Sequence, residues 1–211
     1  MRPDRSGLGT SPSSRAPARG STITYYLYVL IDVYSRYVSG WLLATHESAD
    51  LAKQLIADSV EREGVEPGNL TIHADNGSSM ASKPVALLLE DLAISKSHSR
   101  PHTSNNNPYS EAQFKTLKYR PNFPERFDSI EQARAFCREF FPRHNDKHHH
   151  IGIGLLTPTM VHHGAAPQVT ERRAAILADA YARHPERFLN GQPYPQPIPK
   201  NVWINRPDDT P

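Results

Sequence analysis

Apolar and polar residues along this chain follow two different periods, and these periods predict a domain that mixes strands with helices. Short apolar and aromatic runs predict strands over residues 25–32, 37–45, 70–75 and 93–98. Apolar residues at helical spacing predict helices over residues 48–63, 84–92, 108–119 and 168–183, and a further helix that begins after Ser129. This succession predicts an α/β fold, with a mixed sheet and helices on its faces.

Polar residues and glycine mark where several of these elements begin and end. Ser35-Arg36 lies between the first two predicted strands and indicates a hairpin turn. Ser48 can cap the first helix, and Gly64 ends it. Residues 129–132, Ser-Ile-Glu-Gln, have the pattern of a capping box. Cys137 lies on the apolar side of the helix that follows, so we interpret it as a buried packing residue rather than a nucleophile.

The two ends of the chain differ in composition from the region between them. Residues 1–22 are rich in Arg, Ser, Gly and Pro without an apolar period, which predicts disorder. Residues 185–211 contain many prolines and are predicted to have no fold of their own. The expected organisation is therefore a disordered or aberrant segment over 1–22, a core over 23–165, and a C-terminal helix with a proline-rich tail over 166–211.

Composition narrows the class of protein. The 211 residues include 37% hydrophobic residues, which suits a globular domain with polar ends. No apolar stretch approaches the roughly 20 residues that span a membrane, and the N-terminus has no signal-peptide core. The single cysteine excludes an internal disulfide. We therefore expect a cytoplasmic protein with no membrane partner.

Charge is distributed unevenly along the chain. The net charge is only +2, but residues 96–126 contain six Lys or Arg and two acids, a local charge of +4 that leaves −2 for the remainder. This basic segment surrounds Glu111, where it could follow a phosphate backbone. A solvated helix face is the alternative interpretation of such a run.

Two carboxylates lie in settings that suit a metal site. Asp75 ends a predicted strand and Glu111 begins a predicted helix, with thirty-five residues, 76–110, between them. Carboxylate oxygens are the ligands that Mg²⁺ prefers, and a pair of such ions can hold the attacking and leaving oxygens of a phosphodiester exchange. An Asp and a Glu at this distance also occur by chance, so the spacing alone does not identify the function.

Four segments in the same order resemble the integrase core of bacterial insertion-sequence transposases and retroviral integrases. They are Tyr26 to Trp41 (YLYVLIDVYSRYVSGW), His73 to Met80 (HADNGSSM), Ser99 to Lys118 (SRPHTSNNNPYSEAQFKTLK) and Leu156 to His162 (LTPTMVH). The resemblance covers roughly residues 24–165. It implies a ribonuclease H-like fold in which two Asp and one Glu bind two Mg²⁺ or Mn²⁺ ions.

The resemblance assigns roles to particular residues. It makes Asp75 the second metal carboxylate and Glu111 the third. Lys115 and Lys118 follow Glu111 at positions that share one helix face, so we expect them to bind the DNA backbone. His102 and Asn105 lie in the polar loop before this helix and are further candidates for DNA contact. The implied partners are transposon ends, target DNA and further copies of the chain, in a bacterial, nucleoid-associated setting.

The first carboxylate of the family is missing from this sequence. The related strand typically reads Trp-Asp-Ile-Thr-Lys-Leu, whereas residues 9–14 here are Gly-Thr-Ser-Pro-Ser-Ser, and no acid occurs from Arg5 to Ile31. Asp32 belongs to the next strand, so we interpret it as a hairpin-end residue that binds nearby backbone. Because Pro12 cannot pair in a central strand, we expect a disrupted first strand, an exposed sheet edge, weak stability and poor or absent strand transfer.

A shift of reading frame offers an explanation for this difference. The codons GGG-ACA-TCA-CCA-AGC-TC encode Gly-Thr-Ser-Pro-Ser-Ser, and the same bases read one base earlier after a T encode Trp-Asp-Ile-Thr-Lys-Leu. We therefore hypothesise that residues up to about 22 are an out-of-frame translation of the ordinary first strand. The nucleotide sequence of the gene tests this, because a single-base shift must restore the Trp-Asp-Ile-Thr run.

Histidines are concentrated before the last matching segment. His144, His148, His149 and His150 could suggest zinc, but adjacent histidines do not easily face one ion. Asn145 and His150 match an N-x-x-x-x-H pattern of the family, so we interpret the cluster as a helix end packed near the site. His73 beside Asp75 could contact phosphate or water, or could be an ordinary surface or satisfied histidine.

The leading interpretation is therefore a DNA transposase or integrase core that cleaves and joins phosphodiester bonds, here without its first Asp. The alternative is a catalytically dead DNA-binding protein that mixes with intact subunits. A different nuclease of the same fold and a purely structural module are further alternatives.

Overall fold

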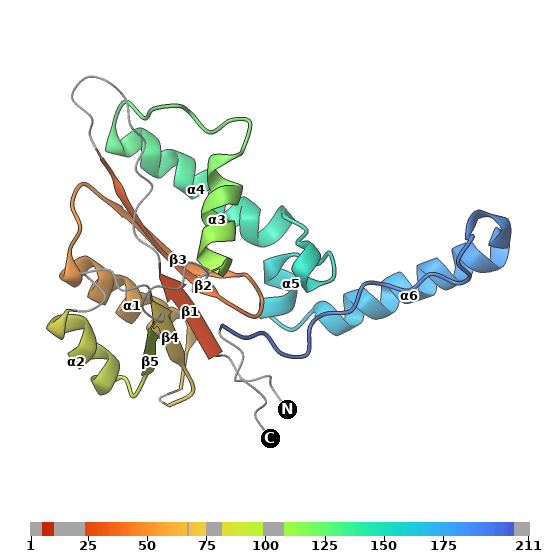
Figure 1. The fold of residues 1–211 in the computed structure, drawn as a ribbon, viewed down its shortest axis with the longest axis horizontal. Helices are drawn as coiled ribbons and strands as arrows, with labels where there is room; N and C mark the ends of the chain where they lie inside the picture. Colours follow the sequence, from red (N-terminus) through yellow and green to blue (C-terminus); the bar gives the residue numbers. More distant parts are fainter. Residues whose placement is uncertain (1–5, 11–23, 67, 75–81, 99–107, 205–211) are drawn as a thin grey trace.

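A five-stranded mixed sheet forms the centre of the molecule in the computed structural model, which describes residues 6–10, 24–66, 68–74, 82–98 and 108–204 (Figure 1). The strands are β1 (Ser6–Thr10), β2 (Tyr26–Asp32), β3 (Val38–Ala44), β4 (Thr71–Ala74) and β5 (Ser95–His98). They lie in the order β3-β2-β1-β4-β5. The β3–β2 and β2–β1 pairs are antiparallel, and the β1–β4 and β4–β5 pairs are parallel.

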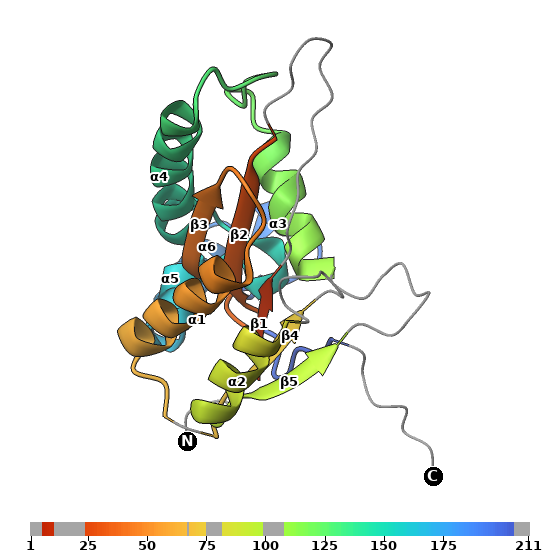
Figure 2. The same cartoon turned by 90° about the vertical axis from the view of Figure 1, so that its left-hand side faces the viewer.

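Helices cover both faces of this sheet, as the two views of the ribbon show (Figures 1 and 2). They are α1 (Ala49–Glu63), α2 (Lys83–Asp91), α3 (Pro108–Lys118), α4 (Ile130–Lys147), α5 (Pro158–His162) and α6 (Ala166–Arg183), with short 3₁₀ turns at Ile151–Ile153 and Pro185–Arg187. The helix α6 extends away from the body, and the segment after it runs back alongside it. None of the helices in the described part is both long and apolar enough to cross a bilayer.

The strand β2 supplies both faces of the sheet with buried side chains. Tyr28 and Leu30 pack in a first cluster with α1 and α2. Leu27 and Val29 point to the other face and pack in a second cluster with α3 and α4. Successive strand residues point to opposite faces, so an inner strand reads as a continuous apolar run. Each such side chain contributes about 1.5–3 kcal/mol on burial.

A third, smaller cluster joins the C-terminal region to this core. Ile153, Leu156, Val161 and Ala166 are buried there, and Ile198 from the C-terminal segment packs against them. The helix α6 starts from this cluster, and Arg173 on its side donates to the Gly154 and Leu155 carbonyl oxygens. The first half of the C-terminal helix is therefore anchored to the body of the molecule.

The strand β1 corrects the expectation for the N-terminal segment. Disorder was predicted over residues 1–22, but Ser6–Thr10 forms the central strand, between β2 and β4. The expectation of an exposed edge at this position is therefore wrong. The reason is that ladder bonds use backbone N–H and C=O groups, which Ser, Gly, Leu and Thr all provide. The strand ends at Thr10, and Pro12, on which the expectation of a disrupted strand rested, lies outside the described residues.

The remaining elements match the predicted pattern closely. The structure confirms the hairpin between β2 and β3, in which the Arg36 N–H donates to the Asp32 carbonyl, the Asp32 N–H donates to the Tyr37 carbonyl, and Arg36 has a φ of 65°. Gly64 ends α1 in a left-handed conformation, and the Ser129 hydroxyl accepts from Gln132 N–H at the start of α4. Cys137 is buried, as expected of a packing residue, and burial raises the pKa of its thiol to about 12.

Candidate functional site

The parallel strands β1 and β4 bring their carboxyl ends to the same edge of the sheet. Thr10 pairs with Ala74 at the last position of both strands. Asp75 follows Ala74 directly in the sequence, although it lies outside the described residues, as do His102 and Asn105. The helix α3 contacts β1. The strand β4, which ends before Asp75, and the helix α3, which carries Glu111, are therefore neighbours of one central strand.

The helix α3 has one buried and one exposed side, and Glu111 lies on the exposed one. Gln113 and Leu117 are buried, and Leu117 belongs to the second cluster. Glu111, Lys115 and Lys118 are all exposed, which fits the predicted common face. Among the residues described, none forms a hydrogen bond or ion pair with the Glu111 carboxylate. Its oxygens are accordingly available to a cation or to solvent on the same helix side as two ammonium groups.

An aromatic contact holds the first turn of α3 against the β2–β3 hairpin. The Arg36 guanidinium lies over the Tyr109 ring, 3.9 Å from its centroid. Arg36 is itself buried and donates to the Val33 carbonyl oxygen. The Tyr109 hydroxyl donates to the Trp203 carbonyl oxygen at 3.3 Å. The β2–β3 hairpin, α3 and the C-terminal segment thus meet at Tyr109, which precedes Glu111 by two residues.

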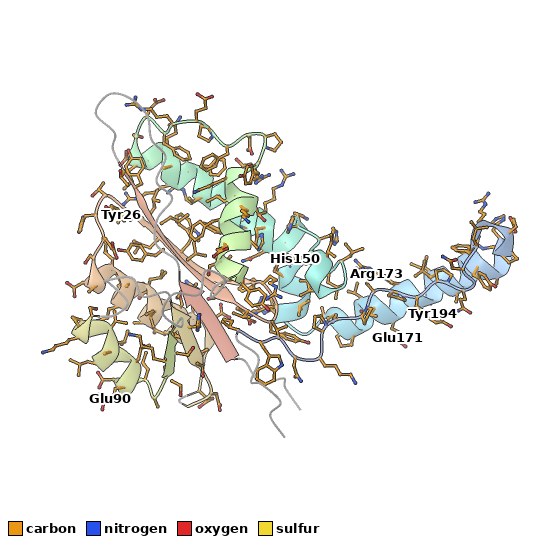
Figure 3. The ribbon with its side chains drawn as sticks, in the orientation of Figure 1. Tyr26, Glu90, His150, Glu171, Arg173 and Tyr194 are labelled. Carbon is orange, nitrogen blue, oxygen red and sulfur yellow. The ribbon has the colours of Figure 1, made fainter. Side chains whose placement is uncertain are left out.

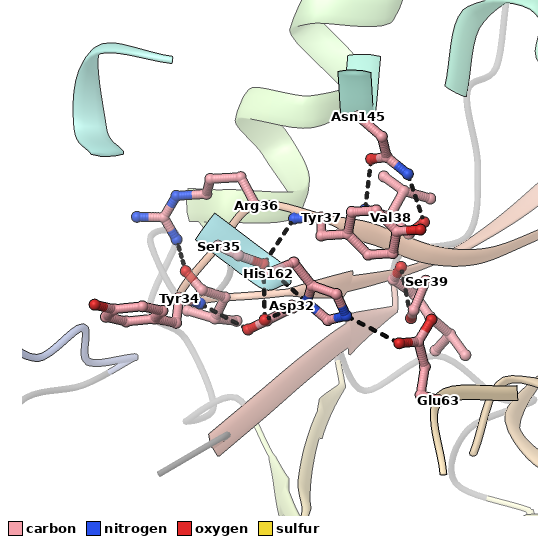
Figure 4. A network of polar contacts seen from close by, with 12 residues as sticks. Asp32, Tyr34, Ser35, Arg36, Tyr37, Val38, Ser39, Glu63, Asn145 and His162 are labelled. Carbon is pink, nitrogen blue, oxygen red and sulfur yellow. Dashed lines mark hydrogen bonds and ion pairs between the residues drawn. The ribbon is translucent and has the colours of Figure 1, made fainter. Parts of the chain in front are cut away.

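A histidine bridges two carboxylates behind this hairpin (Figure 4). His162 Nδ1 lies 3.0 Å from Asp32 Oδ2, and His162 Nε2 lies 2.9 Å from Glu63 Oε2. Tyr37 stacks on the His162 ring with centroids 4.2 Å apart. Asp32 also accepts from the Tyr34 N–H and the Ser35 hydroxyl. The interpretation of Asp32 as a residue that binds hairpin backbone is therefore confirmed.

The charges of this network stabilise one another. Burial alone lowers the pKa of His162, but the hydrogen bonds and negative charges of Asp32 and Glu63 outweigh it and raise that pKa above 6.5. Burial alone raises the pKa of Asp32, but hydrogen bonds from His162 and Ser35 outweigh it and hold that pKa below 3.8. The network therefore joins α5, α1 and the hairpin through the His162 imidazole, whose protonated form is favoured by the two carboxylates.

The histidines of α4 have structural contacts. His144 is buried, which lowers its pKa to about 4, and its Nε2 lies 3.1 Å from the Arg36 carbonyl oxygen. Asn145 donates to the Val38 carbonyl and accepts from the Val38 N–H, so its amide covers the edge of β3. His150 Nδ1 accepts from Gly152 N–H. Over the described ranges, no group of three or more His, Cys, Asp or Glu side chains could hold a metal ion.

The comparisons with known proteins point to one family. Two family models, both described as the integrase core domain, match residues 13–104 and 92–158. Together they span residues 13–158, more than half of the 211-residue chain.

The chain belongs to the integrase core family.

Curated relatives of this integrase core are transposases of insertion sequences. It is 27% identical over 139 residues to the transposase for insertion sequence element IS904 of Lactococcus lactis, a match that covers 64% of this chain and 53% of the relative. It is 29% identical over 134 residues to transposase InsF for insertion sequence IS3A of Escherichia coli, with 63% and 46% covered. The chain spans about half the length of these curated relatives.

Solved structures show that this integrase core has a ribonuclease H-like fold, as predicted. The catalytic core domain of BIV integrase matches with a TM-score of 0.55 at 18% identity, covering 77% of this chain and 96% of that one. The HTLV-2 integrase catalytic core domain in complex with magnesium matches with a TM-score of 0.54 at 15% identity, covering 76% and 98%.

Sequence reasoning about this integrase core missed the contacts that depend on distant segments. His162 was quoted only as the last residue of a matching segment, and its bridge between Asp32 and Glu63 was not foreseen. The contact of Arg36 with Tyr109 was also missed. The sequence shows Arg36 in a turn and Tyr109 shortly before Glu111. Neither feature indicates a contact until the fold brings the two side chains together.

Proposed function

We propose that this chain is the catalytic core of a DNA transposase or integrase, a protein that cuts and joins phosphodiester bonds with divalent ions. The observation that carries the proposal is the exposed face of α3. There Glu111 shares a helix side with Lys115 and Lys118, on a helix that contacts β1. The neighbouring strand β4 ends at the residue before Asp75.

The donor set suits a hard cation. The Glu111 carboxylate is exposed and has no described partner, and Asp75 would supply the second carboxylate. Mg²⁺ or Mn²⁺ held by these two groups would supply Lewis-acid stabilisation of a phosphodiester under attack. Lys115 and Lys118 would hold the flanking phosphates by charge. The hairpin residue Arg36 would keep the first turn of α3 in place through Tyr109.

The role of the α3 face can be tested by reversing its charge. In the Lys115→Glu/Lys118→Glu variant we expect DNA to bind at least about tenfold more weakly, because two phosphate contacts become repulsive. The slope of log K against log[salt] should fall in magnitude by about 2, at roughly 0.9 per phosphate contact. Fluorescence anisotropy with a labelled duplex over a range of salt concentrations measures both quantities.

The matched control makes the same charge change on the other face of the sheet. Lys53 on α1 and Lys83 on α2 are also exposed lysines. The Lys53→Glu/Lys83→Glu variant should bind DNA almost as the parent does. Equal losses in both variants would mean that only net charge matters, and the proposed DNA face would then be incorrect.

A second function is favoured by the sequence of β1. The residues of this strand, Ser-Gly-Leu-Gly-Thr, include no carboxylate, so one of the three metal ligands of the family has no counterpart in it. The chain would then bind DNA and mix with intact transposase subunits without cleaving. DNA binding that persists in EDTA, together with an absence of Mg²⁺-dependent cleavage, favours this function over the first.

A further inference from the structure

The C-terminal segment of the chain returns to the body of the molecule after α6. Figure 1 shows this segment running back alongside the helix. An added Cβ at Gly154 would lie 2.7 Å from the Gln196 carbonyl oxygen, so the segment is in close contact with the backbone there. Ile198 packs into the third cluster. The segment is thus held against the body of the molecule by a close backbone approach and by the packing of an apolar side chain, both of which precede Trp203 in the sequence.

Trp203 is fixed beside the turn of α3 that carries Glu111. Its carbonyl oxygen accepts from the Tyr109 hydroxyl, and the Tyr109 ring is covered by the Arg36 guanidinium. The Trp203 side chain nevertheless remains 53% exposed. A single exposed aromatic residue is ordinary on a protein surface. This one differs because its carbonyl oxygen is hydrogen-bonded to Tyr109, which precedes the proposed catalytic carboxylate by two residues in α3.

The segment leaves the site uncovered. Glu111, Lys115 and Lys118 are all exposed, and Trp203 reaches α3 through the hydrogen bond with Tyr109. A segment that blocked the site would bury the carboxylate, so the observations favour a wall of the binding site over an inhibitory cover. Lys200, exposed three residues before Trp203, adds a positive charge to the same wall.

We propose that Trp203 is a stacking platform for an unpaired nucleobase at the end of the DNA bound along α3. This inference rests on the proposed function and extends it to the form of the DNA. An aromatic ring binds a base by stacking on its face, and this requires a face that is not occupied by a neighbouring base pair. A strand end or an unpaired extension offers such a face, whereas the interior of a duplex does not. The flanking lysines would hold the phosphates of the same strand.

Substitution of Trp203 tests the platform directly. The probes are two labelled duplexes of equal length and sequence, one blunt and one with a short unpaired extension. In Trp203→Ala the affinity for the extended duplex should fall about tenfold, while the affinity for the blunt duplex stays within about twofold. Trp203→Phe should recover most of the loss, because it keeps an aromatic face.

A control on the same segment separates stacking from a general effect of the tail. Tyr194 is 74% exposed, and Figure 3 shows it beside α6, away from the sheet. Tyr194→Ala should bind both duplexes as the parent does. Because Trp203 and Tyr194 are both largely exposed, the melting temperatures of their variants should match that of the parent, and this excludes unfolding as the cause.

Fluorescence supplies an independent readout. The chain has two tryptophans, Trp41 and Trp203, and Trp41 stacks on Phe141 inside the fold. In the Trp41→Phe background the remaining emission comes from Trp203. The extended duplex should quench it strongly, and the blunt duplex should quench it much less.

Three outcomes would overturn the inference. They are unchanged affinity of Trp203→Ala for the extended duplex, equal quenching by both duplexes, and tighter binding by Trp203→Ala, which would make the segment an inhibitory cover. In each case, duplex binding that still depends on Lys115 and Lys118 leaves the proposed function intact. A parent protein that binds neither duplex removes both proposals.

Discussion

The His162 imidazole lies between Asp32 and Glu63, and each of its two nitrogens is within hydrogen-bond distance of one carboxylate. Both nitrogens can donate to carboxylates only when the ring is protonated. A protonated histidine with two acidic partners stabilises the fold, since the pKa of His162 lies above that of an unfolded chain. The stability of the protein is therefore linked to pH at His162.

The sign of this linkage gives a prediction for His162→Gln. The raised pKa of His162 contributes stability that is fully present below pH 6.5 and is lost as pH rises through the folded-state pKa. The lowered pKa of Asp32 contributes stability that is present above pH 3.8 and is lost as pH falls through its folded-state pKa. The parent should be most stable between these two limits, and its advantage over His162→Gln should shrink from pH 6 to pH 9.

Urea denaturation of both proteins across this pH range measures the difference. His149 is an exposed histidine outside the network, and His149→Gln serves as the control. If the free energy difference between the parent and His162→Gln does not change with pH, His162 is not protonated in the folded protein.

At the scale of elements, β3 and α1 pack closely against each other at Gly40. A Cβ added at Gly40 would lie 2.3 Å from Ser59 Oγ and 3.0 Å from Leu55 Cδ1. Ser59 and Leu55 are both buried. A side chain at position 40 must therefore displace the Ser59 and Leu55 side chains or move α1, so the glycine permits the close approach of the two layers.

Gly40→Ala should consequently destabilise the fold by about 1–3 kcal/mol, the range for an overpacked core. The double variant Gly40→Ala/Ser59→Ala should recover part of this loss, because the Oγ atom that clashes has been removed. A double-mutant cycle tests this contact. It compares the free energies of unfolding, measured with urea, of the parent, the two single variants and the double variant. Additive effects of the two substitutions would contradict the contact.

At the scale of the whole molecule, the position of β1 decides whether the metal site can be completed. Thr10 is the last residue of β1 and pairs with Ala74, the residue before Asp75. It is also the position at which the hypothesised frame shift would place the missing Asp. The register of the sheet and the reading of the codons therefore point to the same residue.

Thr10→Asp should introduce Mg²⁺-dependent cleavage of duplex DNA that the parent lacks or performs poorly. Replacement of residues 9–14 by Trp-Asp-Ile-Thr-Lys-Leu should have a larger effect, since it also restores apolar residues to the strand. Nicking of a supercoiled plasmid with Mg²⁺ or EDTA is the measurement. Gly9→Asp is the matched control, because successive strand residues point to opposite faces. Cleavage by Gly9→Asp equal to that of Thr10→Asp would contradict the proposed site.

Local patterns predicted most of the individual elements. The apolar run over β2 and the helical spacing over α1 and α4 were sufficient, because burial on one or two faces imposes a period on the sequence. The common face of Glu111, Lys115 and Lys118 follows from helical geometry alone and needs no partner. The strand β1 was missed because its residues have no apolar period, and only the neighbouring strands make it a strand.

The sequence by itself therefore determined the α/β class, the approximate bounds of β2 and β4 and the charged face of α3, since each depends on residues close together in the chain. The tertiary structure alone decided the insertion of β1 between β2 and β4, the bridge from His162 to residues 130 and 99 positions away, and the docking of Trp203 on Tyr109. The physical reason is that these contacts join segments whose separation in the chain leaves no local period, so only the packed sheet and helices bring their atoms within bonding distance.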